Sequence, residues 1–95
     1  MNNLLDNVKT PREIEYEIAK MARLRRKEAK LTQEELSRKS GVSLGSLKRF
    51  ETKGKVSLES LIKIAFALGY EDDFFRLFEQ RRYRSIEESI DENNQ

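Results

Sequence analysis

Apolar residues recur at intervals of three and four positions through most of the chain, and turn residues separate these periodic segments. The first segment opens with Thr10, Pro11 and Glu13, which have the pattern of a capping box with proline at the first helical position. The pattern predicts a helix of about five turns that ends between Lys27 and Lys30. The stripe that we expect to face the core consists of Ile14, Ile18, Met21, Ala22, Arg25 and Ala29.

Two shorter helices are predicted next, joined by a tight turn. Thr32 and Glu35 form a second capping box, which opens the shorter of the two helices. Its inward residues are Leu36, Ser37 and Ser40. Gly41 ends this helix because a sharp turn needs a positive φ, and Ser43 caps a new helix two residues later. Helices joined by so short a turn must cross steeply.

The helix after Ser43 has one apolar and one polar face. Leu47 and Phe50 are expected to point inward, and Gly54 ends the helix. The opposite face is continuous at helical spacing and comprises Gly45, Lys48, Arg49 and Thr52. A helix, a tight glycine turn and a second helix with a basic outer face together indicate a helix-turn-helix motif.

A fourth helix is predicted between its cap at Ser57 and its end at Gly69. Its apolar stripe comprises Leu58, Leu61, Ile62, Ala65 and Leu68, widened by Ile64 and Phe66. So broad a stripe leaves little of the helix for solvent. We therefore expect this helix to form the centre of the core.

A fifth helix is predicted to begin at a cap formed by Asp72 or Asp73 and to contain Phe74, Leu77 and Phe78. The chain is thus predicted to be all-α, with five helices in one small domain. The expected organisation is an N-terminal arm at 1–9, a helix-turn-helix domain at 10–80 and a C-terminal tail at 81–95.

The composition excludes several kinds of chemistry. The 95 residues include no Cys and no His, so disulfides, Cys or His metal sites and His-based catalysis are excluded. Carboxylates and lysines abound, but no gathered site and no glycine-rich phosphate loop is visible, so we expect no enzyme, no metal and no cofactor. Neither an apolar run of about 18 residues nor a signal peptide occurs, so we expect no membrane span and a cytoplasmic location.

The net charge of +2 hides an uneven distribution along the chain. Residues 20–55 carry 12 basic and 4 acidic side chains, a net charge of +8, whereas residues 71–95 carry −4. A basic segment of this kind is expected of a nucleic-acid face, because Lys and Arg neutralise phosphates and release counterions. The same charges are also compatible with an ordinary solvated helix surface.

Residues from about 18 to 69 resemble the Cro/C1-type (XRE) family of helix-turn-helix regulators. The positions that carry the resemblance are Leu31-Thr32-Gln33-Glu34-Glu35-Leu36-Ser37, Gly41-Val42-Ser43, Leu47, Phe50-Glu51, Gly54, Ser57-Leu58-Glu59-Ser60-Leu61, Ile64-Ala65 and Leu68-Gly69. The resemblance implies a five-helix, phage-repressor-like domain that binds double-stranded DNA as a homodimer. We expect a repressor acting on a palindromic operator.

A recognition helix places its N-terminal residues at the base edges of the major groove. The base-contacting residues expected here are Leu44, Gly45, Ser46, Lys48 and Arg49. Arg49 is the best candidate, because an arginine can donate two hydrogen bonds to guanine O6 and N7. Family members often carry Gln or another long polar residue at the positions of Leu44 and Gly45, so this chain departs from the family pattern there. Gly45 either permits close approach of the helix to DNA or has no function.

The phosphate contacts expected are Gln33, Lys39, Ser43, Lys53 and Lys55. The resemblance implies that the amide of Gln33 binds a phosphate and steadies the recognition helix, and a helix N-terminus favours an anion at that place. The resemblance also implies an ion pair between Arg26 and Glu51 that braces the recognition helix against the first helix.

The apolar residues after the motif have two interpretations, plain core or a surface for a dimer or another protein. They are Tyr70, Phe74, Phe75, Leu77 and Phe78. A narrower resemblance, to HipB-like antitoxins encoded with HipA-type kinases, adds a kinase toxin as a candidate partner. The alternative function is therefore a protein-interaction module that neutralises such a partner and has little DNA binding of its own.

Overall fold

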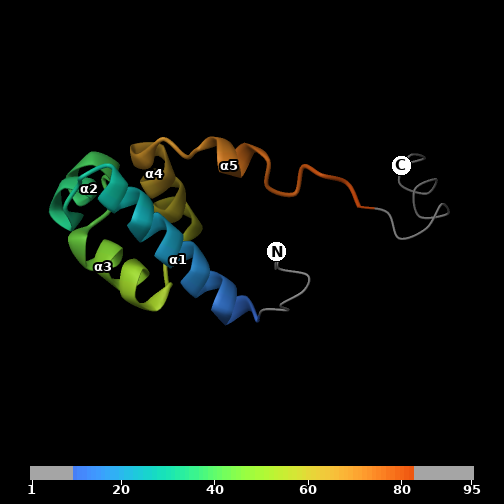
Figure 1. The fold of residues 1–95 in the computed structure, drawn as a ribbon, viewed down its shortest axis with the longest axis horizontal. Coiled ribbons are helices and arrows are strands. Elements are labelled where there is room, and N and C mark those ends of the chain that lie inside the picture. Colours follow the sequence, from blue (N-terminus) through green and yellow to red (C-terminus); the bar gives the residue numbers. More distant parts are fainter. Residues whose placement is uncertain (1–9, 83–95) are drawn as a thin grey trace.

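The computed structural model describes residues 10–82, which contain five helices and no strand. The helices are α1 (Pro11–Glu28), α2 (Gln33–Ser40), α3 (Leu44–Lys53), α4 (Leu58–Leu68) and α5 (Asp72–Phe75). The first four form a bundle, and α5 lies apart from it (Figure 1). The predicted all-α, five-helix fold is confirmed. The predicted arm at 1–9 and most of the predicted tail lie outside the described residues, and the domain bounds stay a prediction.

Local signals set the ends of the helices as predicted. Thr10 Oγ1 accepts a hydrogen bond from the Glu13 N–H at 3.1 Å, and the Glu13 carboxylate accepts one from the Thr10 N–H at 3.1 Å. Thr32 and Glu35 repeat this capping box at α2. The next three helices end at glycines in the left-handed conformation, Gly41, Gly54 and Gly69.

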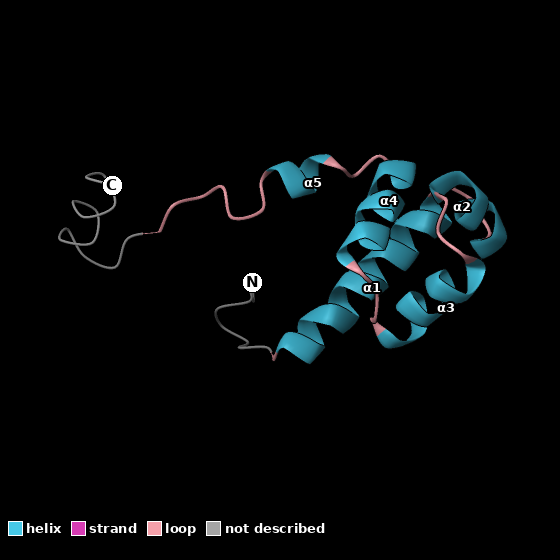
Figure 2. Cartoon of the chain, turned by 180° about the vertical axis from the view of Figure 1, so that it is seen from behind, coloured by secondary structure: helices cyan, strands magenta, loops and turns pink. Residues whose placement is uncertain are grey.

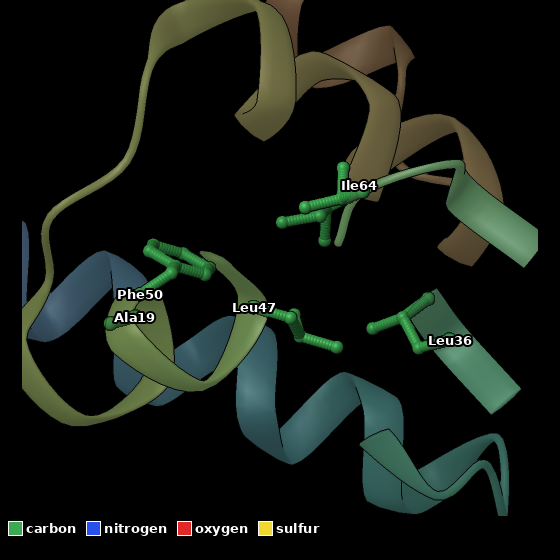
Figure 3. Packing of buried hydrophobic residues seen from close by; sticks show 6 residues of the cluster. Ala19, Leu36, Leu47, Phe50 and Ile64 are labelled. Atoms are coloured by element: carbon green, nitrogen blue, oxygen red, sulfur yellow. The ribbon is translucent and has the colours of Figure 1, made fainter. Parts of the chain in front are cut away.

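The core lies where α1, α2, α3 and α4 meet. Its largest fully buried side chains are Leu36, Leu47, Phe50 and Ile64. They gather in one cluster with Ala19 of α1 (Figure 3). The predicted inward face of α3, Leu47 and Phe50, is confirmed. Burying each of these large side chains stabilises the fold by about 1.5–3 kcal/mol.

The inward stripe predicted for α1 is wrong at four of its six members, whereas Ala22 does pack against the core. Four of its members are exposed, Ile14, Ile18, Met21 and Ala29. The helix buries Ala19 and Arg26 instead, with Ala22 half-buried beside them. Small alanines allow close helix approach, and Arg26 can be buried because Glu51 pairs with it. A pattern of apolar positions contains no sign that an arginine lies on the inward face.

Gly54 allows the end of α3 to lie directly against α1. It is buried with φ +71°, and an added Cβ would lie 3.1 Å from both the carbonyl carbon and the carbonyl oxygen of Glu15. The next residue, Lys55, approaches the Glu15 carboxylate with Nζ at 3.2 Å from Oε1. Arg12 pairs with the same carboxylate oxygen at 2.9 Å. The end of α3 is therefore held against the first half of α1.

The centre of α4 is buried as predicted, at Ile64 and Ala65. Its outer side is more exposed than expected, because Leu58 and Phe66 are 63% and 58% exposed. The expectation that little of α4 is left for solvent is therefore wrong. The bundle packs against one side of α4 only.

The predicted fifth helix is longer than the one observed, since α5 ends before Leu77 and Phe78, which lie in turns. Neither Asp72 nor Asp73 occupies the cap position, which belongs to Glu71 and has no side-chain cap hydrogen bond. Phe78 has a left-handed φ of +62°. The segment after α4 therefore lacks the local signals that define the other helices.

Candidate nucleic-acid interface

Side-chain hydrogen bonds fix the turn between α2 and α3. Ser37 Oγ donates to the Val42 carbonyl at 2.6 Å, and the Val42 N–H donates to Ser40 Oγ at 3.1 Å. The Val42 side chain is buried in the core. Ser43 then caps α3 by accepting a hydrogen bond from the Ser46 N–H at 3.2 Å. The two helices are thus held in one relative orientation by residues of the turn itself.

The outer face of α3 is polar, exposed and basic. Gly45, Ser46, Lys48 and Arg49 are exposed, whereas Leu44 is half-buried. Within residues 10–82 neither Lys48 nor Arg49 forms an ion pair. An added Cβ at Gly45 would meet no atom within 4 Å. The structure therefore presents four of the five expected base-contacting residues to solvent.

The acidic residue of α3 is turned away from this outer face. Glu51 Oε2 accepts a hydrogen bond from Arg26 Nε at 2.7 Å, and Glu51 Oε1 accepts one from Arg26 Nη2 at 2.9 Å. The side chains of Arg26 and Glu51 are 9% and 3% exposed. Hydrogen bonding to Glu51 raises the pKa of Arg26. The negative charge is therefore neutralised inside the fold and does not oppose an anion at the outer face.

Arg26 also links α1 to the start of α2. Its third hydrogen bond, from Nη1, is donated to the Leu31 carbonyl at 2.9 Å. Gln33 Nε2 donates to Glu51 Oε1 at 3.0 Å. One buried ion pair thus connects α1, α2 and α3. A bidentate pair of this kind has a fixed geometry as well as charge.

The Gln33 contact was missed by sequence reasoning, which expected the side-chain amide to be a phosphate ligand. The half-buried side chain instead supports α3 through Glu51. The backbone N–H of Gln33 remains at the first position of α2, where helix donors lack intrahelical partners. No local sequence signal indicates the side-chain contact, because Gln33 and Glu51 are 18 positions apart.

The three flanking lysines differ in what they contact. Lys39 and Lys53 are exposed and form no ion pair with any described residue. Lys55 is held by Glu15, 40 positions away in the sequence. A phosphate would have to compete with that carboxylate for Lys55. Of the three flanking lysines, Lys39 and Lys53 are therefore the two without an ion pair among residues 10–82.

The apolar residues after α4 do not form plain core. Phe74 is half-buried, and Tyr70, Phe75, Leu77 and Phe78 are exposed. The Tyr70 ring lies with its centroid 5.9 Å from the Arg25 guanidinium carbon, within cation–π range.

In the part of the chain that the structure describes, no helix has the length and apolarity needed to cross a bilayer.

Comparison with known protein families matches residues 23–75 to the helix-turn-helix family. No curated protein and no solved structure matches the chain. The narrower resemblance to HipB-like antitoxins stays a prediction. The matched segment spans more than half of the chain and includes the whole of α2, the turn and α3. The chain therefore belongs to the Cro/C1-type (XRE) family of helix-turn-helix DNA-binding regulators.

Proposed function

We propose that this chain is a sequence-specific transcriptional repressor that binds a palindromic DNA operator as a homodimer. The observation that carries the proposal is the separation of charge on α3. Lys48 and Arg49 face solvent without an ion pair among the described residues, while Glu51 is buried against Arg26. The charged side chains on the exposed face of this helix are therefore all basic, as a polyanionic ligand requires.

We assign base readout to Arg49, with Lys48 beside it at the preceding position. The planar guanidinium can donate to guanine O6 and N7 together, which discriminates against a wrong base by about 1–3 kcal/mol. Lys48 either reads a guanine or contacts a phosphate. The first turn of α3 contributes less direct readout, since Gly45 has no side chain and Leu44 is half-buried.

Phosphate contacts orient the helix and carry no sequence information. Lys39 and Lys53 are suited to them because both are exposed and unpaired within residues 10–82. The backbone N–H groups at the starts of α2 and α3, near Gln33 and Ser43, are further donors for a phosphate oxygen. The affinity for DNA should fall as the salt concentration rises, and each neutralised phosphate makes this dependence steeper.

The homodimer rests on the symmetry of operators. A two-fold protein dimer matches two half-sites that lie about 34 Å apart along the duplex. One α3 per protomer then enters the major groove at each half-site. Repression is the sign of regulation that the family resemblance implies, and a reporter carrying the regulated upstream region tests it by a rise in expression when the regulator is removed.

Selection of bound sequences from random duplex DNA tests the proposal. We expect a two-fold palindrome to be enriched by the native chain and lost in the double variant Lys48→Ala, Arg49→Ala. The matched control is Lys30→Ala, Lys63→Ala, which removes two exposed cations that lie outside α1 and α3. The control should enrich the same palindrome. Absence of any enriched sequence for the native chain would overturn sequence-specific binding.

A second candidate function is supported by the exposed aromatic residues after α4. Phe75 and Phe78 are 70% and 94% exposed, as expected of residues that contact another protein. In this alternative the chain binds and neutralises a partner such as a kinase toxin. Absence of duplex retention at low salt, together with a stoichiometric complex with a purified kinase encoded beside it, would favour this alternative.

A further inference from the structure

Besides the outer side of α4, the described part of the chain has two exposed apolar surfaces that its own core does not use. The first is on α1 and is named here the α1 stripe, comprising Ile14, Ile18 and Met21. These side chains are 37%, 44% and 44% exposed. Their spacing of four and three positions places them on one face of the helix. That face lies about 100° around α1 from the side that packs on the bundle.

The second surface belongs to the segment 71–79, named here the C-terminal arm, which includes α5. Phe75, Leu77 and Phe78 of this arm are 70%, 55% and 94% exposed. Figures 1 and 2 show the α5 ribbon apart from the bundle and not alongside the first turns of α1. So much clustered apolar surface is unusual on a protein that stays monomeric.

The charges of the two surfaces are complementary in an antiparallel arrangement. The arm begins with three acidic residues, Glu71, Asp72 and Asp73, and Arg76 follows one turn later. α1 has the opposite order, with Glu13 and Glu17 in its first half and Lys20, Arg23, Arg25 and Lys27 in its second half. An arm that runs antiparallel to α1 therefore places its acidic start against the basic second half of α1, whereas its far end, with Arg76 and Glu79, is neutral.

The arm is long enough to reach a second molecule. With the four residues of α5 helical and the other four extended, the segment from Glu71 to Phe78 spans up to about 19 Å, which exceeds the diameter of about 10–12 Å of one helix. The arm leaves the bundle at Tyr70, which lies beside Arg25 at the second half of α1. It is not folded back along the α1 stripe of its own chain.

We propose that two copies of this chain pair by exchanging C-terminal arms. Phe75 and Phe78 of each copy cover Ile14, Ile18 and Met21 of the other copy. The contact is reciprocal, so it closes as a two-fold dimer. It leaves Lys48 and Arg49 free, because the outer face of α3 lies opposite the core that joins α3 to α1. The inference deepens the homodimer of the proposed function by assigning its surfaces.

The first test measures mass by light scattering in the absence of DNA. We expect a dimer for the native chain and monomers for Ile18→Glu and for Phe78→Glu, each with unchanged helical circular dichroism because both side chains are exposed. Tyr16→Glu is the matched control, since Tyr16 is 46% exposed on a different face of α1 and should leave the dimer intact. A native chain that remains monomeric at high concentration would overturn the proposal.

Mixing the two monomeric variants tests the exchange itself. A heterodimer of Ile18→Glu with Phe78→Glu retains one intact contact of the two, so we expect dimers to reappear in the mixture. Dimers formed by like surfaces, stripe on stripe and arm on arm, would place a glutamate in every contact and give no recovery. Failure to recover a dimer therefore overturns the exchange.

The absence of cysteine from the chain allows a direct test of which molecule the arm covers. In the double variant Ile18→Cys, Phe78→Cys, oxidation should produce a disulfide between two chains and a band of doubled mass. A disulfide within one chain would show that the arm folds back on its own α1 and would overturn the exchange. If the dimers exchange arms but do not bind duplex DNA, the result would contradict only the proposed DNA binding.

Discussion

Arg26 of α1 holds both carboxylate oxygens of Glu51 of α3, at 2.7 and 2.9 Å, in a pair whose side chains are 9% and 3% exposed. The contact neutralises the one acidic residue of α3 and fixes the rotation of the helix about its axis. That rotation also sets the outward position of Arg49, which is two positions from Glu51 and so lies about 160° around the helix from it.

Replacement of Glu51 by Gln should destabilise the fold strongly. It leaves the buried Arg26 guanidinium without a counter-charge, and breaking a buried pair in this way costs about 3–5 kcal/mol. Urea unfolding monitored by circular dichroism measures the loss. The matched control is Glu28→Gln, which breaks the more exposed pair of Arg25 and Glu28 and should cost less than about 1 kcal/mol. Equal costs for the two variants would contradict a structural role for Glu51.

Replacement of Gly54 by Ala should cost more stability than replacement of Gly41 by Ala. Both glycines are left-handed, at φ +71° and +77°, so each substitution incurs a conformational cost of about 1–2 kcal/mol. Only at Gly54 does the new Cβ also meet the Glu15 backbone, at 3.1 Å, whereas nothing lies within 4 Å at Gly41. Denaturant midpoints of the two variants make the comparison. Equal midpoints would show that α1 and α3 do not approach closely at Glu15.

Replacement of Gly45 by Ala separates two explanations of a glycine inside the recognition helix. The added Cβ meets open space, so the variant should be more stable by about 1 kcal/mol through helix propensity. If the α3 backbone approaches DNA closely at this position, the same variant should bind its operator more weakly. A stabilised variant with unchanged affinity would show that the glycine has no role in DNA binding.

Stability should fall at acid pH, partly through the cap of α2. The hydrogen bond from the Thr32 N–H to Glu35 lowers the pKa of that carboxyl below its usual 4.5. The pKa of Glu35 is therefore lower in the folded chain than in the unfolded chain. The stabilisation by the Glu35 carboxylate is complete above about pH 4.5 and is lost as the pH falls through the folded-state pKa.

Glu35→Gln keeps an amide oxygen for the cap but cannot ionise, so the dependence of the urea midpoint on pH should be flatter below about pH 5 than in the native chain. Glu34→Gln is the control, because it removes one negative charge at the preceding position and leaves the cap intact. A flatter profile for Glu35→Gln alone would therefore report the cap and not the change of net charge. Identical pH profiles for Glu35→Gln and the native chain would contradict the cap contribution.

The sequence was sufficient for features that depend on neighbouring residues. Thr10 with Glu13 and Thr32 with Glu35 could be recognised as caps because their hydrogen bonds span three positions. Gly41 and the inward face of α3 were predicted for the same reason. These local features define the helix-turn-helix, so the fold and the outer face of α3 could be predicted from the sequence.

Features that depend on distant partners were not predictable in the same way. The ion pair of Arg26 with Glu51, 25 positions away, was expected only from the family resemblance and is present, whereas no apolar pattern signals that α1 buries an arginine. The ion pair of Lys55 with Glu15 and the contact of Gln33 with Glu51 are equally non-local. The length of α5 was overestimated because aromatic residues were counted as helical, although Glu71 provides no side-chain cap.

We propose that the outer face of α3 reads DNA sequence through Arg49. Fluorescence anisotropy with the selected operator and with an unrelated duplex, at one salt concentration, measures the specific and the non-specific affinity of each variant. Arg49→Ala should weaken operator binding about 5- to 150-fold, equivalent to about 1–3 kcal/mol, with much less effect on the unrelated duplex. Lys53→Ala, as the phosphate control, should weaken both to a similar extent. An equal loss on both duplexes for Arg49→Ala would contradict base readout by this helix.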